Sequence, residues 1–126
     1  MSEKMVNANS VDLCTDSFGN PADPAILLVA GAMESMAWWQ EDFCRKLAAC
    51  GRYVIRYDHR DTGRSITYTP GQPEYSLDDL AEDTLGVLDA YRIVRAHIVG
   101  ISLGGMIAQL LAIRHAERVL TISLIA

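Results

Sequence analysis

The sequence of 126 residues lacks several features that mark particular protein classes. No apolar run approaches the roughly 20 residues that a membrane-spanning helix needs. The polar segment 1–10 has no apolar core of the kind that secretory signals carry. Basic residues are scattered and fewer than acidic ones, 11 against 16, which argues against a nucleic-acid or anionic-membrane surface. We therefore expect a cytoplasmic protein with neither nucleic acid nor membrane as a partner.

Cysteine is also scarce, and its spacing is uninformative for metal binding. Cys14, Cys44 and Cys50 cannot all pair, and they match no common metal-ligand pattern. Cys44 and Cys50 lie six residues apart in a region with helical spacing, which suits neither a zinc pair nor a disulfide. We predict reduced cysteines, no metal and no other cofactor.

The apolar residues alternate between strand-like and helix-like spacing. Strands are predicted over residues 10–18, 25–30, 53–57, 96–99 and 119–126, and helices over residues 36–50, from 76 through 88, and 102–115. This order favours an α/β fold with a mainly parallel sheet and helices on both faces. The first two strands, joined by the turn 19–24, are expected to form an antiparallel extension at one edge.

The predicted strand 119–126 is almost wholly apolar and is the last segment of the sequence. An apolar strand at an open sheet edge tends to pair or aggregate. We therefore expect residues 1–126 to be the N-terminal part of a single domain whose cap and C-terminal strands are absent. The same edge is a candidate surface for homo-oligomer formation.

The segment Val99–Gly105 contains the pattern G-x-S-x-G around Ser102. Such a pattern arises by chance in roughly 4% of chains of this length, so its context decides its meaning. It ends a predicted strand and opens a predicted helix, which is the setting of a nucleophile elbow. The serine backbone is strained there, and Gly100 and Gly104 leave room for the turn. We predict that Ser102 is a nucleophile; a serine that only caps the helix is the alternative.

A nucleophilic serine needs N–H donors that stabilise the developing oxyanion. The Leu103 N–H, at the start of the predicted helix, is one candidate. The second is expected from the loop after the strand 25–30, where Gly31 allows close backbone approach and Ala32 offers its N–H. A dinucleotide site is disfavoured, because the turn lacks the G-x-G-x-x-G spacing and Ser123 stands where an acidic residue is needed.

Three segments together resemble the landmarks of α/β-hydrolases, in the same order and at similar intervals: Leu28–Gly31, Arg56–Ser65 and Val99–Gly105. Most of that superfamily has glycine where Asp61 stands. Asp61, the turn Asn20–Pro24 and the strand Ala96–Gly100 are together similar to the aclacinomycin methylesterase group, which are serine esterases of polyketide methyl esters.

The resemblance implies a cofactor-free hydrolase in which Ser102 attacks a small apolar ester. A histidine oriented by a carboxylate then takes the serine proton. Because the family order is Ser, acid, His, both remaining groups are expected beyond Ala126. The oxyanion loop usually begins with His-Gly in the family, whereas this sequence has Ala30-Gly31. Met33 and Trp38 are candidates for the substrate wall.

The three histidines present are poor substitutes for the missing base. His59 lies in a polar turn, where local hydrogen bonding is expected, and His97 lies within a strand. His115 ends the helix that Ser102 opens, roughly 20 Å away. The alternatives to an esterase are the same fold with another reaction (perhydrolysis, thioester hydrolysis or carbon–carbon cleavage), and a catalytically incomplete fragment that binds a partner.

Overall fold

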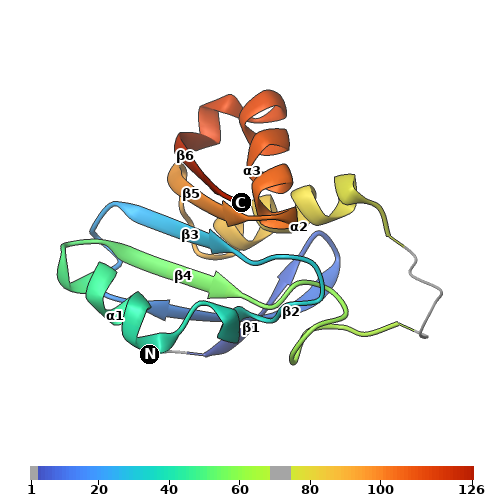
Figure 1. Ribbon diagram of the computed structural model, residues 1–126, viewed down its shortest axis with the longest axis horizontal. Coiled ribbons are helices and arrows are strands. Elements are labelled where there is room, and N and C mark those ends of the chain that lie inside the picture. The colour runs from blue at the N-terminus through green and yellow to red at the C-terminus, as the bar shows by residue number, and fades with distance from the viewer. Residues whose placement is uncertain (1–2, 69–74) are drawn as a thin grey trace.

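The computed structural model describes residues 3–68 and 75–126, which form one sheet with helices on its two sides (Figure 1). The order of the six described strands is β1-β2-β4-β3-β5-β6. The strands are β1 (Lys4–Ala8), β2 (Val11–Phe18), β3 (Ala25–Val29), β4 (Tyr53–Tyr57), β5 (Ala96–Ile101) and β6 (Val119–Ile125). The helices are α1 (Glu41–Ala49), α2 (Leu77–Ala90) and α3 (Leu103–Arg114), with short 3-10 turns η1 (Met36–Trp38) and η2 (Ala116–Arg118).

The predicted fold class is confirmed. Strands β4, β3, β5 and β6 run parallel, and β1 and β2 add an antiparallel edge. Helices α2 and α3 pack on one face, over a core that includes Leu27, Ile55 and Ile98. The other face carries Trp39 and Cys44, from the segment that leads into α1 and from α1 itself. Each strand in the middle of the sheet is therefore covered on both sides, as its apolar sequence predicts.

The antiparallel edge of the sheet is formed by a different pair of strands than predicted. β2 pairs with β4 rather than with β3, because β3 lies between β4 and β5 and has no free edge. The partner of β2 on the outer side is β1, a strand that was not predicted and of which only Ala8 is buried. Asn9 and Ser10 both have positive φ, as the tight two-residue turn of such a hairpin requires.

The predicted helix 36–50 is interrupted. It is divided into η1 and α1, with Trp39 in an extended conformation between them. The cause is a tertiary contact: the Arg56 guanidinium donates to the Trp39 carbonyl oxygen at 2.7 Å and forms an ion pair with buried Asp16 at 2.8 Å. Beyond the break, α1 ends at Ala49, and Gly51 follows its C-cap with positive φ.

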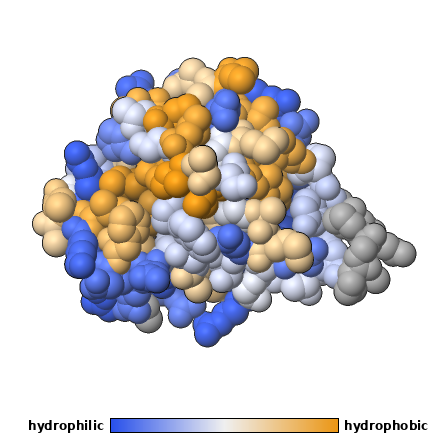
Figure 2. Space-filling view, viewed as in Figure 1, coloured by the Kyte–Doolittle hydropathy of each residue, from blue (hydrophilic) through white to orange (hydrophobic). Residues whose placement is uncertain are grey.

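The remaining elements agree with the sequence. α2 begins, as predicted, near residue 76, and a capping box between Ser76 and Asp79 opens it. At the other end of the sheet, β6 pairs on one side only, and its apolar residues Leu120, Ile122, Leu124 and Ile125 are exposed. Figure 2 shows hydrophobic residues gathered over the part of the molecule where Figure 1 draws β5, β6 and α3. Homo-oligomer formation through this edge stays a prediction.

Candidate active site

Ser102 stands at the junction of β5 and α3 in a strained backbone conformation. Its φ of 52° and ψ of −113° fall in a region that residues other than glycine rarely occupy. Its carbonyl oxygen accepts the first helical hydrogen bonds, from the N–H groups of Gly105 and Met106. Its side chain is exposed and makes no capping hydrogen bond. Ser102 therefore stands at the N-cap position of α3 in a strained turn, but its hydroxyl does not cap the helix.

Two glycines beside Ser102 are required by space. A Cβ atom on Gly100 would lie closer than 3.0 Å to the backbone of Gly104, and one on Gly104 would lie equally close to the Val29 carbonyl oxygen. Real Cβ atoms essentially never approach other atoms so closely. The spacing of the G-x-S-x-G pattern thus reflects the tight packing of the elbow against itself and against the end of β3.

We expect Gly104→Ala to lower the free energy of unfolding by about 1–3 kcal/mol, because the β3 backbone must shift to admit the methyl group. Gly105→Ala is the matched control one residue along the same helix. A Cβ atom there comes no closer than 3.6 Å to any neighbour, and alanine gains about 0.5–1 kcal/mol over glycine in a helix. Urea unfolding of both variants measures the difference, and a Gly104→Ala variant as stable as Gly105→Ala would contradict the packing argument.

The loop that follows β3 lies directly beside Ser102. Val29 and Gly100 are partners in the parallel register, so β3 and β5 end close to each other at the same edge of the sheet. A Cβ atom on Gly31 would lie 3.7 Å from the Ser102 Cβ, an ordinary van der Waals distance. The loop therefore approaches the elbow closely, as expected, although the space at Gly31 also admits an alanine.

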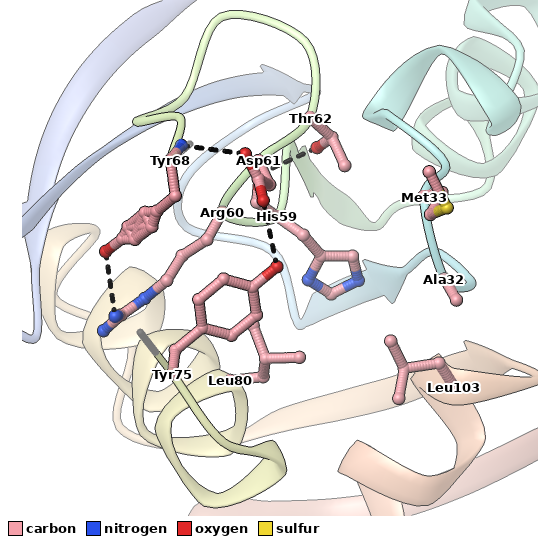
Figure 3. A pocket seen from close by; sticks show the side chains of 10 residues that line it. All are labelled: Ala32, Met33, His59, Arg60, Asp61, Thr62, Tyr68, Tyr75, Leu80 and Leu103. Carbon is pink, nitrogen blue, oxygen red and sulfur yellow. Dashed lines mark hydrogen bonds between the residues drawn. The ribbon is translucent and has the colours of Figure 1, made fainter. Parts of the chain in front are cut away.

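A cavity of about 520 Å³ borders this loop and Leu103, the residue that follows Ser102 (Figure 3). The two candidate oxyanion donors, Ala32 and Leu103, lie together on one side of it. Met33 also lines it, although its side chain is 95% exposed. The other residues around it are His59, Arg60, Asp61, Thr62, Tyr68, Tyr75 and Leu80.

Trp38 does not reach this cavity. It lines a separate hollow of about 650 Å³ together with Trp39, Phe43 and Ile125. Of the two tryptophans, Trp39 is buried in the core and Trp38 is partly exposed. Of the two candidates for the substrate wall, Met33 is therefore at the cavity beside the elbow and Trp38 is not.

The segment 58–65 is polar in sequence yet largely buried, which sequence reasoning missed. The Asp58 carboxylate accepts hydrogen bonds from the Met36 N–H at 2.8 Å and the Arg64 N–H at 3.0 Å. The Ser65 hydroxyl donates to the Asp58 carbonyl oxygen and accepts from the Cys14 N–H. These bonds tie the loop to β2 and to the start of η1, and so make it a rigid wall of the cavity.

Arg60 forms the most buried ion pair of this wall. Its guanidinium donates to the carboxylate of Asp83 on α2, with Nε 2.6 Å and Nη2 2.9 Å from the two oxygens. It also donates to the Tyr68 hydroxyl at 3.2 Å. Asp61, with a positive φ of 67°, accepts from the Tyr68 N–H and the Tyr75 hydroxyl. No periodic pattern links these residues, because they come from separate loops and α2.

None of the three histidines makes a hydrogen bond to the Ser102 side chain in residues 3–68 and 75–126. His59 is buried, its Nε2 lies 2.8 Å from the Ala30 carbonyl oxygen, and burial lowers its pKa. His97 bonds the Thr121 hydroxyl, and His115 contacts Glu82 at the far end of α3. The expectations of local or structural roles for them agree with these contacts.

Other chemistries find less support in the described part of the chain. All three cysteines are free thiols, and burial raises the pKa of Cys44 to about 11, which keeps this thiol protonated. Within residues 3–68 and 75–126, no cluster of three or more His, Cys, Asp or Glu side chains could hold a metal ion. None of the described helices is both long and apolar enough to cross a membrane.

Comparison with known proteins places this geometry in a family. Residues 24–126 match the family model of the alpha/beta hydrolase fold. The chain is 47% identical over 123 residues to rhodomycin D methylesterase DauP of Streptomyces sp. strain C5, covering 98% of this chain and 41% of that protein. It is 38% identical over 109 residues to the putative carbamate hydrolase RutD of Caulobacter segnis, covering 84% of this chain and 39% of the relative.

A solved structure has the same fold. Epoxide hydrolase A from Mycobacterium thermoresistibile superposes with a TM-score of 0.88 at 27% sequence identity, over 98% of this chain and 38% of that one. The chain thus spans about two fifths of the length of the proteins it matches. The resemblance inferred from the three sequence segments is confirmed, and the chain belongs to the α/β-hydrolase fold family.

Proposed function

We propose that the protein is a serine hydrolase that cleaves a carboxylic ester through an acyl-enzyme. The observation that carries this proposal is the strained, exposed Ser102 at the elbow, beside a cavity bordered by Ala32 and Leu103. Strain at one polar residue is typical of catalytic positions, because the surrounding packing has to maintain it. Residues 1–126 form, in this proposal, the N-terminal part of a single α/β-hydrolase domain.

The Ser102 hydroxyl attacks the ester carbonyl while a general base takes its proton. The backbone N–H groups of Ala32 and Leu103 stabilise the negative charge on the carbonyl oxygen. The alcohol then leaves with a proton, and water releases the acid from the serine. In the order Ser, acid, His, the two remaining triad members follow the part of the relatives that this chain matches.

The cavity suits a small ester with an apolar body. Leu80, Leu103 and Met33 provide apolar contact, while Tyr68 and Tyr75 add rings with hydroxyl groups. The methylesterase name of a relative that is 47% identical supports a methyl ester as the substrate class. A cytoplasmic location stays a prediction.

The experiment is covalent labelling with a fluorophosphonate probe, together with assays of a methyl ester and a p-nitrophenyl ester, on the protein as its gene encodes it. We expect the probe to modify Ser102, as mapped by peptide mass spectrometry, and both esters to be hydrolysed. A heat-denatured sample controls for nonspecific labelling. Absence of both labelling and hydrolysis in a folded sample would contradict the proposal and favour a binding role for the same cavity.

A further inference from the structure

His59 links two parts of the site that are far apart in the sequence. His59 is the second residue after the end of β4, next to Asp58 in the sequence. Only 4% of its surface is exposed. Its Nε2 lies 2.8 Å from the carbonyl oxygen of Ala30, the residue after β3. A carbonyl oxygen can only accept, so Nε2 carries the hydrogen and the imidazole donates it. The bond connects β4 to the start of the loop that lies beside Ser102.

The accepting carbonyl group occupies a sensitive position. The Ala30 oxygen lies 2.9 Å from the point where a Cβ atom of Gly104 would stand, so this peptide group packs against the elbow itself. The Ala30 carbonyl belongs to the peptide unit that precedes the one carrying the Ala32 N–H. Holding its plane therefore limits how freely the next peptide unit, with the Ala32 N–H, can reorient.

The imidazole is itself held in one orientation. Its ring packs edge-on against the Tyr57 ring, with 5.2 Å between the centroids. Figure 3 shows the His59 ring between Tyr75 on one side and Ala32 and Leu103 on the other. Nδ1 is buried and has no hydrogen-bond partner among the described residues. A second proton on the ring would therefore have no acceptor, which favours the neutral form that donates from Nε2.

We propose that His59 is a positioning residue for the oxyanion hole, which fixes the loop Ala30–Ala32 through the hydrogen bond from Nε2 to the Ala30 carbonyl oxygen. This inference rests on the proposed function. His59 acts through the loop: its Nε2–H bonds the protein backbone, and the ring carries no proton to or from the ester. Burial lowers its pKa against the opposing influence of the hydrogen bond to Ala30 and of the nearby Asp83 and Asp58 carboxylates, so the ring stays neutral at neutral pH.

Two variants of His59 distinguish a side chain that reaches the position of Nε2 from one that reaches only the position of Nδ1. His59→Gln carries an amide N–H at the position of Nε2, so it retains a donor for Ala30. His59→Asn is one methylene shorter, so its amide stops at the position of Nδ1. We expect kcat for ester hydrolysis to fall about 100-fold in His59→Asn, because the Ala32 N–H is then no longer held as an oxyanion donor. In His59→Gln, which keeps the hydrogen bond to Ala30, kcat should stay within about threefold of wild type. KM is expected to be nearly unchanged in both, because the lost contact acts in the transition state.

The measurements are kcat and KM for the same methyl ester, with thermal unfolding of each variant, on the protein as its gene encodes it. Equal kcat in wild type and folded His59→Asn would overturn the positioning role and leave the proposed function intact. The positioning role would also be overturned if both variants lost kcat equally and in proportion to their loss of folded protein. His59 would then have a purely structural role. Absence of hydrolysis by wild type would overturn the proposed function and this inference with it.

Discussion

Ser102→Ala is expected to reduce kcat for ester hydrolysis by about 10⁶-fold, the scale seen when the nucleophile of a serine hydrolase is removed. The hydroxyl of Thr62 is not free to replace it. Thr62, which lines the same cavity, is buried and donates its hydroxyl hydrogen to the His59 carbonyl oxygen at 2.8 Å. Removing an exposed oxygen that caps nothing should leave the free energy of unfolding within about 0.5 kcal/mol of wild type. The measurement is steady-state hydrolysis of the methyl ester, with urea unfolding of the same samples.

Ser76→Ala is the control for this substitution. It removes the N-cap of α2, which should cost about 1 kcal/mol of stability, while kcat stays at the wild-type value. We thus expect Ser102→Ala to lower kcat with little change in stability, and Ser76→Ala to lower stability with no change in kcat. A Ser102→Ala variant that retained a tenth or more of the wild-type kcat would show that the elbow serine is not the nucleophile.

Asp83→Ala is expected to have the largest effect on stability, about 3–5 kcal/mol, because it leaves the Arg60 guanidinium buried without its carboxylate partner. The Arg60 side chain is 8% exposed and that of Asp83 is 1% exposed, so solvent cannot replace the lost interaction. The change also removes an acceptor of the Asn9 side chain in the β1–β2 hairpin turn. Urea unfolding measures the loss of free energy.

The matched control is Glu82→Ala, one residue earlier on α2. The Glu82 side chain is 43% exposed and contacts His115 at 3.3 Å, so its loss should cost less than about 1 kcal/mol. If the two alanine variants were equally stable, the buried pair would contribute no more than a surface contact. The wall of the cavity would then have to be held by the Asp58 and Ser65 hydrogen bonds alone.

Part of the site could be predicted because its geometry is encoded within a few residues. Gly100 is required by the backbone of Gly104 within the elbow itself, so the five-residue pattern between a strand and a helix was sufficient to locate Ser102. The alternation of apolar strands and helices was likewise sufficient for the parallel sheet, since the spacing of apolar residues depends mainly on which faces are buried.

The tertiary structure alone decided which polar residues are buried and with which partners. The segment 58–65 looks like a surface turn, yet Asp58 and Arg60 are buried, because hydrogen bonds from η1 and a carboxylate from α2 compensate their charges. The break before α1 depends in the same way on Arg56, which lies on the neighbouring strand β4. Burying a charge is favourable only when a partner is in place, and here the partners of Asp58, Arg60 and Arg56 lie 22, 23 and 40 residues away in the sequence. The elbow could therefore be predicted from the sequence, whereas the wall of the cavity and the role of His59 could be inferred only from the folded protein.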